Sequence, residues 1–213
     1  MCRLLFVQNK KQKFSIGEHL SKFASIAKNS MEYQGHGWGC SYLKNNEWVH
    51  YKNIKPIWED DLEQFGTSNR LIAHARSAFE DKDIAVENNM PFHDDKYVFI
   101  FNGELRGVKI KANGRIGAEK IFNFIKRFDE KGMKYALPKG VEIINKRTSY
   151  LRAMNIIIAE KNKVHYSSLF NEDPEYFQMH YKHSADELVI CSEVYPDESE
   201  WNKIANNSNG VFK

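Results

Sequence analysis

The sequence predicts an α+β fold in which short antiparallel strands form stacked sheets and helices pack on the outer faces. Three observations indicate this fold. Apolar runs of strand length, bounded by turn residues, recur along the chain, and only a few segments show the helical period. A third observation is the composition, 42% hydrophobic and 28% charged, which is typical of globular proteins. The 213 residues contain no repeat and no linker, so we predict a single domain over residues 1–213.

The N-terminal part predicts a strand followed by a helix. Residues 1–7 form an apolar run that starts at the terminus, and such a run favours a strand held inside the fold. Ser15 and Glu18 have the spacing of a capping box, and apolar residues follow at helical intervals. We therefore expect a helix over residues 17–30.

Further strands are predicted in the first half of the chain. Asn45 and Asn46 separate two strand-like runs and predict a hairpin. The run at 96–101 ends at Asn102-Gly103, a dipeptide that is common in turns. The strands expected in this half are residues 38–44, 47–52, 71–76 and 96–101.

The second half predicts two helices and a β-rich end. Residues 117–128 place apolar side chains on one broad face, which indicates an amphipathic helix. A second helix is expected over 138–148, with Pro138 in its first turn. The remaining strands are expected at residues 155–160, 163–168, 176–181 and 188–192.

Charge and cysteine content exclude several classes of function. The formal net charge of +3 is small and the basic residues are scattered, which argues against a nucleic-acid partner. No apolar run has the length of a membrane span or the form of a secretory signal, so no membrane association is expected. Three cysteines cannot form a disulfide framework, so we expect a cytoplasmic protein.

Cys2 is the most informative residue for chemistry. If Met1 is removed, Cys2 carries a thiol and a free α-amine, whose ordinary pKa of about 7.7–8.0 suits a general base. A nucleophile activated by its own terminal amine is an established arrangement. Taken alone, however, a cysteine here is better explained as a small buried apolar residue.

Two downstream features give Cys2 a possible setting. Arg76 ends a predicted strand two residues after His74, a place that suits a guanidinium binding a substrate carboxylate. Asn102 and Gly103 could direct a side-chain amide and a backbone N–H at one oxyanion. An ion pair and an ordinary turn are the alternative interpretations of these two features.

The ordered set of short motifs resembles the class II glutamine amidotransferases, which are N-terminal-nucleophile hydrolases with a cysteine nucleophile. The resemblance rests on Met-Cys-Arg-Leu-Leu at the start, Gly-Trp-Gly at 37–39 and Ala-His-Ala-Arg at 73–76. It continues with Glu-Asn-Asn-Met-Pro-Phe at 87–92, Phe-Asn-Gly at 101–103 and Cys-Ser-Glu at 191–193, followed by Trp201. These motifs keep the family's order over nearly the whole chain.

The resemblance implies a fold and a set of roles. The fold is a four-layer αββα sandwich, and Cys2 is the nucleophile with its α-amine as the base. Asn102 and Gly103 form the oxyanion hole. Arg76, with His74 on the same strand, binds the α-carboxylate of a glutamine-like substrate, and Gly117 stands at the position of the substrate's α-ammonium.

Four positions depart from the family pattern. His36 stands in place of Asp, Met90 and Phe101 each in place of His, and Gly117 in place of the Asp that pairs with the α-ammonium. The sequence therefore favours a substrate other than free glutamine.

The expected function is an amidohydrolase that cleaves a carboxamide, glutamine or more readily a modified γ-glutamyl amide, through a thioester on Cys2. The chain holds no second domain for an acceptor, so it either hydrolyses the amide or passes ammonia to a separate synthase subunit. No cofactor is expected, because there is no phosphate-binding glycine loop and no dinucleotide fingerprint. No metal site is expected either, because His180 and His183 lack a third ligand. The alternative is a catalytically silent, regulatory subunit that binds a partner or ligand.

Overall fold

The computed structural model describes residues 1–213, and the chain forms two compact units. The first unit contains residues 1–91 and 179–204, and the second contains residues 92–178 and 205–213. None of the α-helices is long and apolar enough to cross a lipid bilayer.

The first unit is built on a seven-stranded antiparallel sheet. Its strand order is β13-β11-β12-β1-β6-β3-β4, so β1 lies at the centre between β12 and β6. Strands β2 and β5 form a separate sheet of two strands. The strands are β1 (Arg3–Asn9), β2 (Phe14–Ser15), β3 (Trp38–Lys44), β4 (Glu47–Asn53), β5 (Thr67–Ser68), β6 (Arg70–Ala75), β11 (His180–His183), β12 (Glu187–Cys191) and β13 (Asn202–Lys203).

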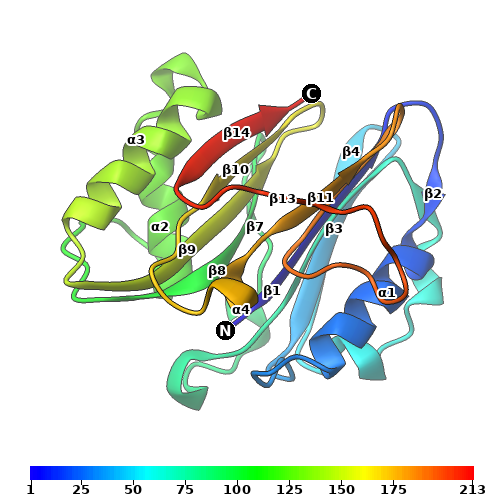
Figure 1. The fold of residues 1–213 in the computed structure, drawn as a ribbon, viewed down its shortest axis with the longest axis horizontal. Coiled ribbons are helices and arrows are strands. Elements are labelled where there is room, and N and C mark those ends of the chain that lie inside the picture. The colour runs from blue at the N-terminus through cyan, green and yellow to red at the C-terminus, as the bar shows by residue number, and fades with distance from the viewer. The chain divides into compact units, whose positions relative to one another are not determined.

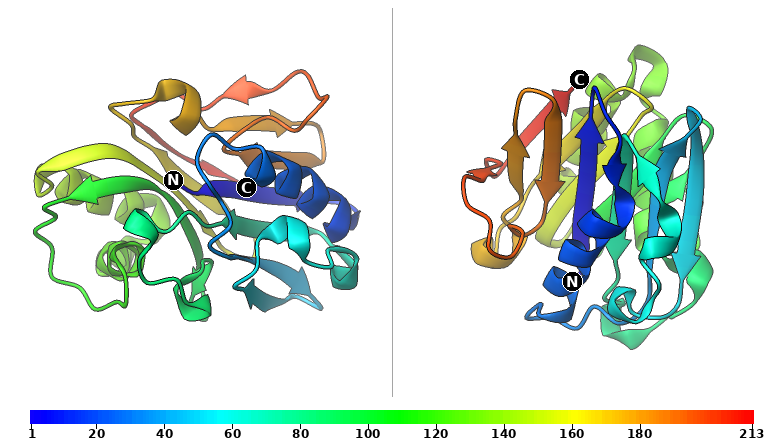
Figure 2. Two further views of the ribbon diagram at one scale, coloured as in Figure 1. Left: turned by 90° about the horizontal axis from the view of Figure 1, so that it is seen from below. Right: turned by 90° about the vertical axis from the view of Figure 1, so that its right-hand side faces the viewer.

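Helix α1 (Ile16–Lys28) covers one face of this sheet, as Figures 1 and 2 show. Its buried residues Leu20 and Phe23 pack into one hydrophobic cluster with Leu5 and Val7 of β1. The Ser15 hydroxyl accepts a hydrogen bond from the backbone N–H of Glu18 at 3.3 Å, so the predicted helix start is confirmed.

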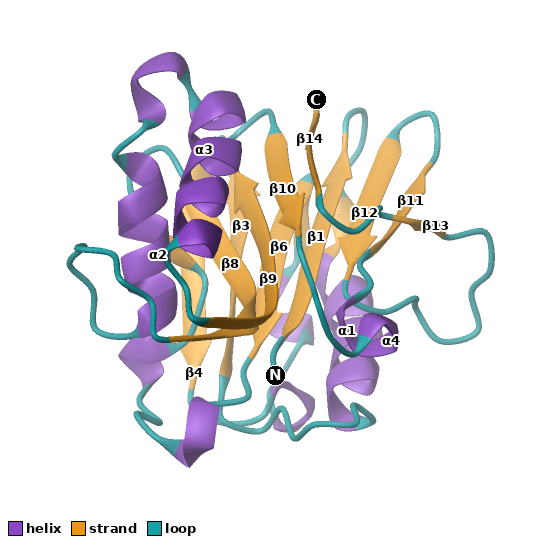
Figure 3. Ribbon diagram, turned by 60° about the vertical axis from the view of Figure 1, so that its left-hand side comes forward, coloured by secondary structure: helices purple, strands orange, loops and turns teal.

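The second unit has a five-stranded antiparallel sheet of order β14-β10-β9-β8-β7, and helices α2 and α3 lie over it (Figure 3). Phe99 of β8 stacks on Phe122 of α2 with ring centroids 4.9 Å apart, which defines the helix-facing side of the sheet. The elements are β7 (Phe92–His93), β8 (Val98–Arg106), β9 (Tyr150–Ala159), β10 (Val164–Ser168), β14 (Ser208–Phe212), α2 (Gly117–Lys126), α3 (Met133–Lys146) and α4 (Pro174–Phe177).

Most predicted elements are present, and the hairpin β3–β4 has its turn at Asn45 and Asn46 in the left-handed region. Three predictions are wrong in detail. Asn102 and Gly103 do not form a turn but continue β8, because β9 pairs with β8 along its whole length. Pro138 lies inside α3, which begins at Met133. The segment 176–181 was predicted as a strand, but its first residues form the end of α4, because Pro174 starts a helical turn there.

Candidate active site

Cys2 lies directly before the central strand of the seven-stranded sheet. The backbone of Leu4 exchanges hydrogen bonds with Ser192 beyond β12, donating to its Oγ at 3.0 Å and accepting from its N–H at 3.0 Å. The Cys2 side chain is 8% exposed, and its Sγ donates to the carbonyl oxygen of Ser77 at 3.5 Å. The start of β1 thus holds the thiol in a fixed place.

Burial raises the pKa of the Cys2 thiol, and its effect is larger than that of the nearby charges. The terminal ammonium of Met1 and the guanidinium of Arg76 lower this pKa, whereas the carboxylate of Glu32 raises it. Since the thiolate is the reactive form of cysteine, these two cations are the groups that favour a nucleophile here.

Arg76 follows β6 and is 5% exposed. Its Nη1 donates to Asn89 Oδ1 at 3.3 Å and its Nη2 donates to the carbonyl oxygen of Asp83 at 2.9 Å. Burial lowers the pKa of the guanidinium, and the neighbouring Cys2 and Asp83 raise it. A guanidinium has five N–H donors, so Arg76 is oriented by these contacts and can still bind an anion.

The segment after α1 encloses the chain terminus in a way the sequence did not indicate. The fully buried Gln34 donates from Nε2 to the carbonyl oxygens of Met1 and Glu32, the latter at 2.8 Å. The terminal ammonium of Met1 pairs with the Glu32 carboxylate. Neither Glu32 nor Gln34 belongs to a motif that we recognised, and only their place just before the Gly-Trp-Gly motif points to them.

His36, one of the departures from the family pattern, connects two loops. Its Nδ1 accepts the backbone N–H of Ala78 at 2.9 Å, and its Nε2 lies 3.5 Å from Asp81 Oδ1. Burial lowers the pKa of His36, and because Nδ1 accepts, the ring proton is on Nε2. The imidazole therefore fixes the loop that follows Arg76.

His74 occupies a core position of β6. Its Cα pairs with Leu4 of β1 and Gly39 of β3, and its side chain is fully buried. Because side chains alternate along a strand, His74 lies on the face opposite Leu5, the residue that packs with α1.

Asn102 and Gly103 lie in the second unit, in the middle of β8, opposite Asn155 and Met154 of β9. Asn102 has the opposite orientation to Phe101 on the strand, and therefore to the helix-facing Phe99. Its side chain is fully buried, and neither Oδ1 nor Nδ2 has a hydrogen-bond partner. Such a group costs stability, so an unpaired amide here calls for an explanation.

Gly117 is the first residue of α2 and is exposed. A Cβ built on it would meet no atom within 4 Å. Glu119, the nearest acid in the same turn, accepts the Arg115 backbone N–H and its guanidinium, each at 2.6 Å. No carboxylate thus replaces the absent aspartate in this turn.

The predicted site residues fall into two groups. The first unit brings Cys2 and Arg76 together at the end of two neighbouring strands, with His74 on β6. The second unit holds Asn102 and Gly103 next to each other on β8, and Gly117 apart from them on α2.

The fold is that of class II glutamine amidotransferase domains. A glutamine aminotransferase class-II domain protein from Silicibacter pomeroyi superposes with a TM-score of 0.64 at 12% identity, covering 99% of this chain and 94% of that one. A protein from Pseudomonas aeruginosa named "predicted glutamine amidotransferase" gives a TM-score of 0.57 at 14% identity, covering 99% and 92%.

The same fold forms part of a longer enzyme. Glutamine phosphoribosylpyrophosphate amidotransferase from B. subtilis gives a TM-score of 0.63 at 14% identity, with 90% of this chain matching 42% of that one. Comparison with protein-family models and with curated proteins gave no match. The solved structures confirm the fold class expected from the sequence, the αββα type of the N-terminal-nucleophile hydrolases.

Proposed function

We propose that this protein is a cysteine amidohydrolase of the class II glutamine amidotransferase type. The observation that carries the proposal is the buried Cys2 thiol before the central strand, within the electrostatic influence of Arg76 and of the chain terminus. The fold shared with glutamine amidotransferase domains supports it.

In the proposed reaction the α-amine of Cys2 takes the thiol proton once Met1 has been removed. The sulfur then forms a bond to the amide carbon, and the carbonyl oxygen becomes an oxyanion that Asn102 Nδ2 and the Gly103 N–H stabilise. The protonated amine returns its proton to the leaving nitrogen as the C–N bond breaks. Water hydrolyses the thioester and restores the thiol.

The unpaired amide of Asn102 supports its part in this reaction. A buried donor without a partner is available to charge that develops only in the transition state, and it needs no rearrangement at that moment. The orientation of Arg76 by Asn89 and Asp83 likewise supports a rigid clamp for the substrate's carboxylate.

The substrate is a γ-glutamyl amide whose α-nitrogen is acylated or absent. An α-ammonium bound without a carboxylate partner would lose hydration at a cost of several kcal/mol. Gly117 provides no carboxylate, and Glu119 already binds Arg115. The open space at Gly117 leaves room for an additional group. The released ammonia either leaves or passes to a separate synthase subunit.

The test measures ammonia or amine release from glutamine and from a series of N-acyl γ-glutamyl amides, with protein whose Met1 removal is verified by mass spectrometry. We expect turnover by the processed protein, and none by Cys2→Ala, which removes the nucleophile. Cys40→Ala is the matched control, because Cys40 is a fully buried cysteine of β3 and its variant should keep activity. A fully processed protein without turnover of any amide would favour the silent, regulatory alternative.

The preference for the substrate is tested separately by Gly117→Asp. This variant should raise kcat/KM for free glutamine and lower it for the N-acylated amides. If the unmodified protein already uses free glutamine well and Gly117→Asp brings no gain, the proposed substrate class is wrong, while the hydrolase itself stands.

A further inference from the structure

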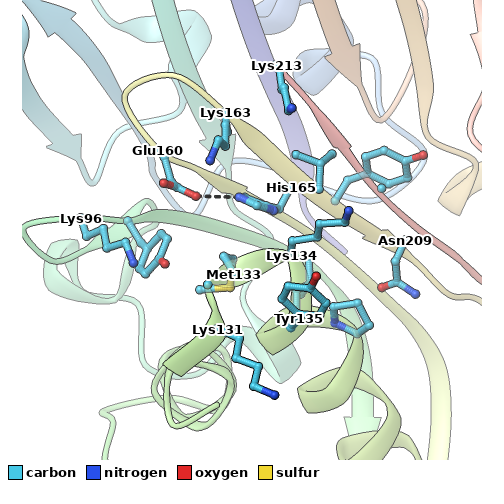
Figure 4. A pocket seen from close by; sticks show the side chains of 17 residues that line it. Lys96, Lys131, Met133, Lys134, Tyr135, Glu160, Lys163, His165, Asn209 and Lys213 are labelled. Carbon is cyan, nitrogen blue, oxygen red and sulfur yellow. Dashed lines mark hydrogen bonds and ion pairs between the residues drawn. The ribbon is translucent and has the colours of Figure 1, made fainter. Parts of the chain in front are cut away.

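A cavity of about 750 Å³ lies wholly within the second unit, away from the predicted catalytic residues. It opens beside the start of α3, between that helix and strands β10 and β14 (Figure 4). The proposed amidohydrolase reaction uses none of its residues. Its inner wall is largely apolar and includes Tyr97, Met133, Leu137, Pro138 and Val211.

The mouth of the cavity is positively charged. Lys131 and Lys134 are exposed side chains at the start of α3 that form no ion pair. Lys96, by contrast, is bound to Asp129 at 3.0 Å. Helix α3 has no side-chain cap and no acidic residue in its first turn, so the positive end of its dipole adds to the lysine charges.

His165 provides a hydrogen-bonding group in the wall. It is 2% exposed, and its Nε2 lies 2.8 Å from Glu160 Oε1, as the dashed line in Figure 4 shows. Its Nδ1 is buried and has no hydrogen-bond partner. Because the carboxylate can only accept, Nε2 carries the proton in the neutral ring, and Nδ1 presents a lone pair.

The state of His165 follows from its surroundings. Burial lowers the pKa of the imidazole, although Glu160 acts in the opposite direction. The ring is therefore neutral near pH 7, and a molecule that meets Nδ1 must supply an N–H or O–H donor. Tyr135, 59% exposed, provides an aromatic surface at the mouth.

We propose that this cavity binds a small organic anion with an aromatic or apolar body, an acidic group for Lys131 and Lys134, and an N–H or O–H donor for His165 Nδ1. The acidic group is a carboxylate, sulfonate or phosphate, since each would be attracted by the lysines and the helix terminus. The body fills the apolar wall.

The test uses two fluorescent probes of nearly equal shape. Anilinonaphthalene sulfonate has an aromatic body, an N–H and an anionic group, and N-phenylnaphthylamine has the same body and N–H without the charge. We expect saturable one-to-one binding of the sulfonate, tighter than that of the neutral probe. Added salt should lower the affinity for the sulfonate and leave the affinity for the neutral probe unchanged.

The lysines are tested by the double variant Lys131→Gln/Lys134→Gln. Its affinity for the sulfonate should fall roughly fivefold, the scale of two exposed charge contacts, with no change for the neutral probe. The matched control is Lys109→Gln/Lys111→Gln, two exposed lysines of the same unit outside the cavity. An equal loss in both double variants, or no loss in the first, overturns the proposal.

His165→Phe keeps a ring but removes the hydrogen-bond acceptor. This variant should therefore bind both probes more weakly, and by the same factor. Thermal unfolding of each variant shows whether the fold is retained. If His165→Phe is folded and binds both probes as before, Nδ1 has no part in binding and the proposed ligand chemistry is wrong. Should that variant not fold, the lysine pair alone decides the outcome.

Discussion

At Asn102 the proposed catalytic role lowers the stability of the folded protein. A buried amide that makes no hydrogen bond costs about 1–3 kcal/mol. Asn155, opposite it on β9, is also buried but is fully used: its Nδ2 donates to the Phe177 carbonyl at 2.7 Å and its Oδ1 accepts the Leu169 N–H at 3.2 Å. Asn155 is therefore a suitable control position for a substitution at Asn102.

Asn102→Leu should therefore stabilise the protein and abolish most of its activity. We expect the free energy of unfolding to rise by about 1 kcal/mol, because an unpaired polar group is replaced by an apolar one of similar size. The rate of amide cleavage should fall about 10²–10³-fold, the usual loss for one oxyanion donor. Denaturant unfolding and kcat measure the two effects.

Asn155→Leu is the control, and it should lower the free energy of unfolding because it leaves a carbonyl and an N–H without partners. A destabilisation of the same size in both variants would mean that Asn102 is bonded in the folded protein and is not held ready for an oxyanion.

Arg76→Lys should act mainly on substrate binding. The ammonium of lysine cannot bind Asn89, the Asp83 carbonyl and a carboxylate in the fixed fork of a guanidinium. We expect KM to rise about tenfold or more with a smaller change in kcat. Steady-state kinetics separate the two. The control is Arg70→Lys, at a buried arginine of β6 that binds Gln8. It should leave KM unchanged, and a similar rise in KM there would contradict the role assigned to Arg76.

At the scale of elements, strands β8 and β9 show where sequence patterns mislead. The Asn-Gly pair is a strong turn signal, but neither residue has a positive φ here. Gly103 is required for another reason: a Cβ on it would lie 2.1 Å from the Ala153 carbonyl oxygen. A close approach between two strands cannot be recognised from one strand's sequence.

This difference between glycines can be measured. Gly103→Ala should lower the free energy of unfolding by about 1–3 kcal/mol, because the methyl group collides with the backbone of β9. Gly117→Ala should be neutral or stabilising by up to about 1 kcal/mol, since its Cβ meets open space at a helix start. Thermal or urea unfolding compares them. Equal effects would show that the contact at Gly103 does not constrain β8.

The sequence predicted the other elements to different degrees. Ser15 and the Asn45-Asn46 turn mark their boundaries by local chemistry, and both boundaries were found as predicted. The start of α3 was missed by five residues, because Gly132 at its N-cap carries no side-chain signal. Glu32, Gln34 and the cavity at His165 were not predicted, because they depend on contacts between segments far apart in the sequence.

For the whole molecule, acid sensitivity follows from four histidines that are buried or half-buried. Burial lowers the pKa of His19 to about 4, and its Nδ1 lies 2.9 Å from the hydroxyl of Tyr195. Burial likewise lowers the pKa values of His36, His165 and His180. In each case the unfolded chain binds the proton more readily than the folded one.

The free energy of unfolding should thus be largest above about pH 6.5 and fall as the pH decreases toward about 4, with His19 contributing on the order of 2 kcal/mol. His19→Gln, which keeps an acceptor for Tyr195, should make the profile flatter in this window. Urea unfolding at a series of pH values measures it. A profile that stays flat between pH 6.5 and 4 in the unmodified protein would show that these histidines accept protons in the folded state.

The central place of β1 has a consequence for how the protein is made. Strand β12, which completes one side of β1, is synthesised about 180 residues after it, and Leu4 is joined to Ser192 across 188 positions. During translation the nascent chain can pair β1 only with β6, and the other edge of β1 stays open until residue 191 has left the ribosome. Such distant pairing slows folding. The pairing of β1 with β6, which brings Cys2 beside Arg76, can therefore form early, whereas the β12 side of the sheet around the proposed nucleophile is completed only near the end of synthesis.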